Sequence, residues 1–420
     1  MSTQALVRIG EETDLYYADP KNTEKQAIAV EYNSRYKQNF SNLGPGTSTL
    51  IIPPGNGVRN IVIVLKYAAS GAGAALAGQV GARALPRGWG YSAVKNITFR
   101  VAGSSQYQLS GSQLLQRNMR LCRTKSQRDS ILQLGGAQVA WNPAGGLPNP
   151  FLQDQYAYIP VSVFASPSAD GIALPLPGDL LSQSIQISCE LDSASNFWTG
   201  TVAGPVDAGV PAAFNAAYFQ VEQLIMPDRS MSLANRVDMN THSYGMPLPD
   251  FDQQEQVIAL QATAAEQSVT LTGFRAGEVK KIVVWLTKNS DTTNDQLWYA
   301  PKASTVLYGG VIYSQYEDGS SQIWNLLDGT APSAVDQSQL SAGAGFWDST
   351  GVLSQWAELP FAQPTGNDYD GEVLVHGKSI ESGLVNLNIT TPDASAYTLR
   401  AVYVYNCTLM FSKGSADLVF

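Results

Sequence analysis

The chain has 420 residues, of which 44% are hydrophobic and only 15% are charged, and its formal net charge is -9. This length exceeds what one hydrophobic core usually serves, and it predicts two domains of about 200 residues each. The acidic balance argues against direct nucleic-acid binding, which needs clustered Lys and Arg. The charged share lies well below the roughly 25% of an average soluble domain, so we expect short strands, polar loops and surface buried between copies of the chain.

The three cysteines, Cys122, Cys189 and Cys407, cannot make a disulfide framework, and an odd number is typical of a reducing compartment. The first residues are polar and charged, and no apolar run approaches the roughly 18 residues of a membrane span. We therefore expect a protein that is made in the cytoplasm without a secretory signal.

The first element in chain order is an arm, residues 1–38, which is too polar to hold a core and which we expect to order only against a partner. The first β-domain is predicted over residues 39–192. It opens with strands at 47–52 and Val58–Leu65. The second of these is a β-branched run bounded by Pro and Gly, as is typical of a strand in the core of a β-sandwich.

Residues 68–84 are rich in Gly and Ala and predict an exposed loop, which is no phosphate cradle because no GK[ST] follows it. A strand at 90–101 and a helix at 112–122 come next, the helix with an apolar face that includes Leu114 and Met119. Basic residues on the helix and its exit predict a solvent-exposed face, with a contact to an acidic partner as the alternative. These residues are Arg117, Arg120, Arg123, Lys125 and Arg128.

The first domain is predicted to close with strands at 156–164, 171–177 and 181–191. A Gly/Ala/Pro-rich linker at 193–216 then leads to the second domain, 217–420, which we expect to open with the strand 218–226. A β-branched run follows at Val279–Leu286, and then an aromatic-rich stretch at 294–324 and a polar loop at 328–346. Three closing strands are predicted at 372–376, 384–389 and 397–411.

Two predicted strands of the first domain are similar in sequence to strands of the second. Val58–Leu65 and Val279–Leu286 share Val, Ile, Val and Leu at four matching positions, and both have a basic residue second. A further echo pairs Ile185–Cys189 with Val402–Cys407, because both are alternating strands that reach a cysteine. Together they predict two similar β-domains in tandem.

Catalytic chemistry finds little support in the residue pattern. His242 and His376 are the only histidines and lie too far apart in sequence to suggest the clustered metal ligands of a cupin. We interpret the acidic stretch Asn367–Glu372 as a turn, because it lacks the register of a calcium loop. A glycosidase needs two carboxylates across a cleft, and Asp348 and Glu358 are candidates only because they are carboxylates. We therefore expect no catalytic, cofactor-binding or metal-binding residue, and no cofactor.

Several aromatic residues could form a platform on which sugar rings stack. They are the basis of the alternative hypothesis, that the chain is a carbohydrate-binding or host-attachment protein. Our first interpretation places them in the core and in subunit interfaces. They are Trp285, Trp298, Tyr299, Tyr313 and Trp324.

Four groups of segments follow one another in the same order as similar segments of one protein family. They are Gly90–Gln106 with the helix 112–122; Ile159–Phe164, Gly171–Pro177 and Ile185–Ile187; Met226–Ser230; and Leu384–Ile389 with Leu399–Asn406. In this order they resemble the double jelly-roll major capsid proteins of icosahedral double-stranded DNA viruses, the lineage of the nucleocytoplasmic large DNA viruses, PRD1 and adenovirus. The resemblance spans residues 38–420. One aromatic residue, Phe164, stands where the family has several, which leaves the virus group open.

The resemblance implies an all-β fold of two tandem eight-stranded antiparallel jelly rolls with a short helix and long loops. It implies a structural protein and no enzyme: a homotrimer that forms pseudo-hexagonal capsomers and tiles an icosahedral virion shell. The implied partners are neighbouring capsomers, minor capsid and penton proteins, and an internal viral membrane reached by residues 1–38. Its location would be the virion, after synthesis in the host cytoplasm.

Overall fold

The computed structural model describes most of both β-domains. The described residues are 7–9, 32–55, 57–68, 83–85, 87–101, 107–122, 125–137, 139–141, 153–161, 176, 178, 181–193, 199–200, 213–225, 243–273, 275–289, 299, 301–308, 311–317, 356–361, 378–380 and 385–419.

The first sandwich is built from two four-stranded antiparallel sheets. One has the order β2 (Tyr32–Asn39), β12 (Ala216–Ile225), β4 (Gly57–Tyr67), β9 (Gln155–Pro160). The other has the order β3 (Gly46–Ile52), β10 (Ile185–Leu191), β6 (Val94–Val101), β7 (Tyr107–Ser110). Beside them lie three helices and a small sheet: α2 (Trp89–Ala93), α3 (Gly111–Arg120), α4 (Lys125–Leu134), β11 (Thr199–Gly200), β5 (Arg83–Leu85) and β8 (Val139–Trp141).

The second sandwich has the same plan. Its first sheet has the path β13 (Ser243–Asp252), β22 (Tyr397–Ser412), β16 (Gly277–Lys288), β19 (Ala357–Pro360). Its second sheet has the order β15 (Gln267–Leu271), β21 (Val385–Thr390), β17 (Ala303–Tyr308), β18 (Val311–Glu317). Four more strands extend the first sheet: β1 (Val7–Ile9), β14 (Gln256–Ala259), β20 (Lys378–Ile380) and β23 (Ser415–Val419). The expected all-β fold of two tandem jelly rolls is confirmed.

The two sandwiches match strand for strand, with β12 and β4 at the places of β22 and β16. Even an irregularity is shared. The pairing of β12 with β4 passes over Arg59, and the pairing of β22 with β16 passes over Lys280, the same basic position of the repeated run. A β-bulge thus stands at one place in both copies, and the duplication predicted from Val58–Leu65 and Val279–Leu286 is confirmed.

The predicted equivalence of Ile185–Cys189 and Val402–Cys407 is wrong. Strand β10, which holds Cys189, lies between β3 and β6, and its counterpart in the other sandwich is β21. Strand β22, which holds Cys407, corresponds to β12 instead. Alternating side chains show only that one face of a strand is buried, and they do not identify its neighbours.

The pairing also revises the predicted domain limits. Residues 217–225 were expected to open the second domain, but β12 pairs with β2 and β4 and buries Phe219 and Val221 in the core of the first sandwich. Residues 32–38 of the expected arm form most of β2, and Phe214 of the expected linker is buried in the same core. We infer that the first sandwich spans residues 32–225 and that the second begins at Ser243.

The expected arm also supplies a strand to the second sandwich. Strand β1 pairs with the first residues of β13, where Val7 lies opposite Gly245. The chain's own first strand therefore covers the edge of β13 at Ser243–Gly245. No described helix is long and apolar enough to cross a membrane.

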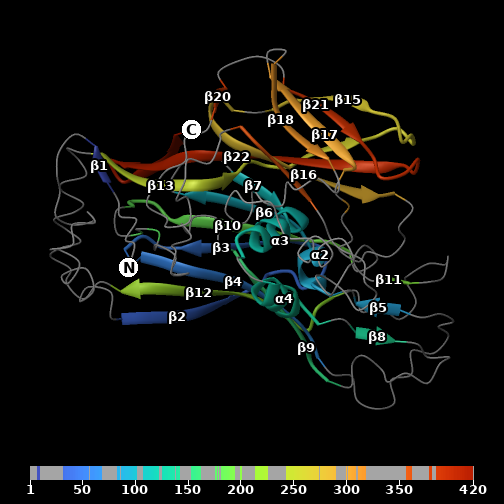
Figure 1. Ribbon diagram of the computed structural model, residues 1–420. Helices are drawn as coiled ribbons and strands as arrows, with labels where there is room; N and C mark the ends of the chain where they lie inside the picture. The colour runs from blue at the N-terminus through green and yellow to red at the C-terminus, as the bar shows by residue number, and fades with distance from the viewer. Residues whose placement is uncertain are drawn as a thin grey trace.

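Figure 1 shows the four main sheets as successive layers, from β2, β12 and β4 at the bottom to β15, β21 and β17 at the top. The third layer holds β16, whose side chains are buried on both faces. Ile282, Val284 and Leu286 point into the core of the second sandwich, whereas Val283 and Trp285 belong to the core of the first. The first hydrophobic core therefore continues across the boundary between the sandwiches.

Trp285 provides a test of this continuous core. Replacing Trp285 with Ala removes a side chain that is 0% exposed, so we expect a loss of about 3–5 kcal/mol in the free energy of unfolding, measured by urea denaturation. The control is Val257→Ala in β14, because Val257 is 55% exposed and should change stability by less than about 0.5 kcal/mol. Equal effects of the two substitutions would contradict the shared core.

Candidate functional site

The described part of the chain concentrates its buried polar groups where α3 of the first sandwich meets β13 of the second. Helix α3 begins at Gly111 because the side chain of Ser110 accepts a hydrogen bond from the backbone N–H of Gln113, which caps the helix. Leu114 and Met119 pack into the first core. Another face of the same helix presents Gln113, Arg117 and Arg120 to the second sandwich.

Asp252, at the end of β13, is the centre of this junction and is 0% exposed. Arg117 Nη1 lies 3.1 Å from Asp252 Oδ1, and Arg120 Nη2 donates a hydrogen bond to the same oxygen. Tyr107 OH donates to the carbonyl oxygen of Asp252, and Arg117 donates to that of Asp250. We call Tyr107, Gln113, Arg117, Arg120 and Asp252 the junction cluster.

Gln113 adds a bridge that uses both ends of its amide. Its Nε2 donates to the carbonyl oxygen of Gln253 at 2.6 Å, and its Oε1 accepts from the backbone N–H of Glu255 at 3.0 Å. A buried amide bound at both ends fixes the helix relative to the backbone just after β13. The junction cluster therefore sets the position of one sandwich against the other.

Lysines on β16 extend this electrostatic network. Lys280 Nζ lies 3.3 Å from Asp250 Oδ1, and Lys281 Nζ lies 2.6 Å from Glu358 Oε2. Burial raises the pKa of Asp250 and of Glu358, but the nearby positive charges outweigh burial and hold both pKa values below the ordinary range. Lys280 and Lys281 lower the pKa of Asp250, and Lys281 and Arg120 lower that of Glu358.

The network corrects one prediction. Arg117 and Arg120 were expected on a solvent-exposed face, but their side chains are only 2% and 4% exposed. Their acidic partner lies in the same chain, 132 residues from Arg120, and helix periodicity carries no information about so distant a residue. Arg123 and the side chains of Lys125 and Arg128 lie outside the described residues.

Among the histidines and carboxylates that are candidates for a metal site or a glycosidase pair, the structure describes only Glu358. It forms the ion pair with Lys281 and accepts a hydrogen bond from Trp356 Nε1 at 3.1 Å. His242, His376, Asp348 and the stretch Asn367–Glu372 lie outside the described residues. Within the described ranges, no three His, Cys, Asp or Glu side chains gather as a metal site would require.

The proposed sugar platform is not supported at the aromatic residues that can be placed. Trp285 is fully buried in the first core. Tyr299 is partly buried, packs against the second core and meets the edge of the Tyr397 ring with centroids 5.8 Å apart. Trp298, Trp324 and the side chain of Tyr313 lie outside the described residues. Core packing, our first interpretation, is confirmed for Trp285.

All three cysteines are free thiols. Burial raises the pKa of Cys407 to about 12 and also raises that of Cys189. A thiol with a raised pKa holds little of the reactive thiolate at neutral pH. Cys122 is less buried, and its Sγ donates to the carbonyl oxygen of Asn118 at 3.1 Å.

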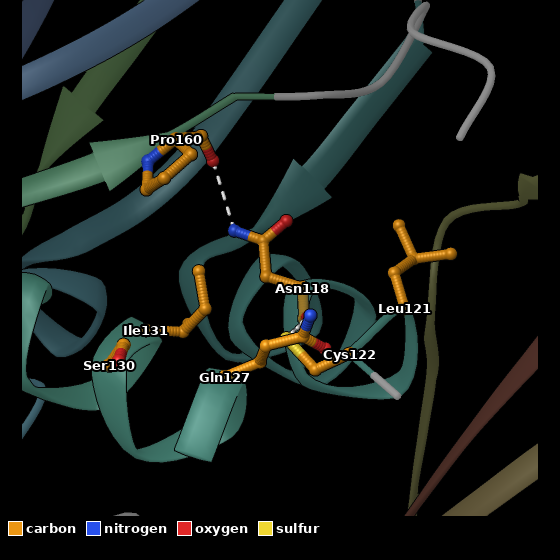
Figure 2. Close-up of a pocket in the computed structure, with 7 residues that line it drawn as sticks. All are labelled: Asn118, Leu121, Cys122, Gln127, Ser130, Ile131 and Pro160. Carbon is orange, nitrogen blue, oxygen red and sulfur yellow. Dashed lines mark hydrogen bonds between the residues drawn. The ribbon is translucent and has the colours of Figure 1, made fainter. Parts of the chain in front are cut away.

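One pocket of about 440 Å³ lies between α3, α4 and the end of β9, as Figure 2 shows. Asn118 closes one side of it, donating from Nδ2 to the carbonyl oxygen of Pro160 and to Tyr91 OH, each at 3.0 Å. The described lining has no acidic or basic side chain, so it offers neither paired carboxylates nor a phosphate-binding cation. It is formed by Asn118, Leu121, Cys122, Gln127, Ser130, Ile131 and Pro160.

Comparison with known proteins found similarity in structure alone. No family model matches the sequence, and no curated protein matches it. Among solved structures, VP54 of PBCV-1, fitted into a reconstruction of the virophage Sputnik, has a TM-score of 0.61 and 11% identity over 93% of this chain and 97% of its own. A model of the PBCV-1 virus capsid gives 0.58 and 12%, again over 93% and 97%. The Faustovirus major capsid protein gives 0.52 and 9% over 94% and 95%.

These matches cover nearly the whole of both chains, although identity is low. They establish that this chain has the double jelly-roll fold of viral major capsid proteins, and they confirm the resemblance seen in the order of its segments.

The junction cluster should respond strongly to loss of its carboxylate. Asp252→Ala leaves Arg117 and Arg120 buried without their partner, so we expect a loss of about 3–5 kcal/mol in the free energy of unfolding, measured by urea denaturation. Asp393, which pairs with Lys288 at 2.9 Å on the surface, is the control, and Asp393→Asn should cost less than about 1 kcal/mol. A small effect of Asp252→Ala would show that the cluster does not hold the sandwiches together.

The lowered pKa values predict a pH dependence. Asp250 and Glu358 bind protons less readily in the folded chain, so they stabilise it above their ordinary pKa values near 4, and this contribution is lost as the pH falls through the folded values. We expect Glu358→Gln to lower the urea midpoint at pH 7 and to differ less from wild type at pH 3. A difference that stays constant between pH 7 and pH 3 would contradict the role given to this carboxylate.

Proposed function

We propose that this chain is a structural capsid protein, which forms homotrimers and, from them, the pseudo-hexagonal capsomers of an icosahedral virion shell. The shared fold supports the proposal, because the solved structures that match nearly the whole chain include the capsid of PBCV-1 and the major capsid protein of Faustovirus. The proposed role is burial between subunits and involves no catalysis.

The observation that carries the proposal is the repetition of one sandwich within a single chain. The two sandwiches have the same strand order and share a bulge position, and the junction cluster and the continuous core hold them together. Three such chains around a threefold axis would present six similar units, which is the geometry that packs a hexagonal lattice.

The proposed partners follow from this role. They are neighbouring capsomers, minor capsid and penton proteins, and an internal viral membrane that the residues before β2 would reach. Because residues 7–9 pair with β13 of the same chain, contacts with a membrane or a minor protein would fall to other residues of this segment. We place the protein in the virion, after synthesis in the host cytoplasm.

The native mass tests the proposal. Light scattering on a sizing column should give three times 45.0 kDa, about 135 kDa, and negative-stain images of the same peak should show hexagonal outlines. A folded protein that remains at 45.0 kDa at every concentration would contradict the proposal.

A further inference from the structure

We propose that a bound water molecule is a fixed part of the junction between the two sandwiches, held by the side-chain amide of Gln116 and by the ion pairs of Asp252. The proposal concerns polar atoms that the contacts of the junction cluster leave over. It is independent of the proposed trimer, because both groups belong to one chain. The water would link helix α3 of the first sandwich to strand β13 of the second.

Gln116 is a buried amide in the middle of α3. The residue is 0% exposed, and neither Nε2 nor Oε1 has a hydrogen-bond partner within the part of the chain that the structure describes. Buried polar groups are almost always hydrogen-bonded, and leaving one unpaired costs free energy of folding. We therefore expect a further group to meet this amide.

The geometry of the helix directs this amide toward the second sandwich. Residues three or four apart lie on the same face of a helix, and Gln116 lies three residues after Gln113 and four before Arg120. Both of these neighbours bond to the second sandwich, Gln113 to the backbone of Gln253 and Arg120 to Asp252. Gln116 therefore shares the face of α3 that carries the junction cluster.

The junction cluster has buried atoms of its own that make no hydrogen bond to a described residue. Arg117 and Arg120 both lie against Oδ1 of Asp252, whereas Oδ2 of the same carboxylate has no such partner. On the arginines, Nε of Arg117 and Nη1 of Arg120 are likewise buried without one. Together with the Gln116 amide, donors and acceptors that still need partners therefore occur in one buried cluster.

This mixture of donors and acceptors identifies water as the ligand and argues against an ion. A halide would accept hydrogen bonds from the arginines, but the carboxylate of Asp252 would repel it and Gln116 Oε1 could not bond to it. A metal cation would be repelled by Arg117 and Arg120. Water donates and accepts, and a buried water typically makes about three hydrogen bonds to polar groups that lack other partners.

The water gives Gln116 a positioning role that complements that of Gln113. Gln113 bonds directly to the backbone that follows β13, whereas Gln116 reaches the side chains of the cluster through the water. A hydrogen bond mediated by an ordered water is enthalpically nearly as good as a direct one. Removing the Gln116 amide should therefore weaken the junction, although this amide bonds to no described residue.

A crystallographic map of the intact protein that resolves ordered waters tests the site directly. We expect a water peak within about 2.7–3.2 Å of the Gln116 amide and of Asp252 Oδ2 or an arginine nitrogen. A map with no peak there would overturn the proposal, as would one in which another side chain bonds to the Gln116 amide. Bromide, supplied in place of chloride and located at this position by anomalous scattering, would overturn it too, because the ligand would then be a halide.

Stability gives an independent measurement, because the two states of the amide predict opposite signs. Gln116→Met keeps the length of the side chain and removes both polar atoms. If the amide holds a water, the urea midpoint should fall, since the water loses a partner; if the amide is dry and unpaired, the midpoint should rise. The matched control is Gln133→Met on α4, where the side chain is exposed and the midpoint should not change. A Gln116→Met midpoint at or above that of the control would overturn the proposal.

Discussion

The relation between the two jelly rolls depends on one buried carboxylate. Asp252 has no contact with bulk water, and an ionised group in such a place is costly unless charges and hydrogen bonds replace the lost solvent. Arg117 and Arg120 supply the charge from α3, while Gln113 fixes the backbone that follows. Each sandwich thus completes a polar site in the other, and Trp285 adds apolar area across the same boundary. The two halves are therefore expected to unfold together.

The two sandwiches share a backbone plan and differ in the side chains on equivalent faces. Strand order and the bulge at Arg59 and Lys280 are common to both copies, but Gln220 and Glu222 stand where the second copy has Val402 and Val404. Strand pairing depends on main-chain hydrogen bonds, which tolerate many side chains. The polarity of the side chains on one face of a sheet depends instead on what covers that face. The face that lies against the other sandwich buries Val402 and Val404 beside the ion pair of Lys281 and Glu358, whereas its counterpart has polar side chains at the places of the two valines.

The sequence allowed two similar β-domains to be predicted because β-branched runs such as Val58–Leu65 are a local signal of buried strands, and one run is repeated. The jelly-roll topology was implied only by the resemblance to the capsid family. The position of β12 was missed, since its neighbour β4 lies far back in the chain and alternation in Tyr218–Ile225 fits either domain. The burial of Arg117 and Arg120 was missed for a similar reason. Their partner, Asp252, belongs to a segment that local periodicity cannot connect to α3.

The late position of Asp252 in the chain has a consequence for synthesis. All strands of the first sandwich have been made once Ile225 has been added, so this half can collapse on its own while the ribosome continues. Until Asp252 emerges, the two arginines of α3 have no carboxylate to bind and remain hydrated. Strand β1, although made first, must wait for β13 before it gains its hydrogen bonds. The first strand to be made is therefore paired only after every strand of the first sandwich has been synthesised, and the ion pairs across the junction form later still.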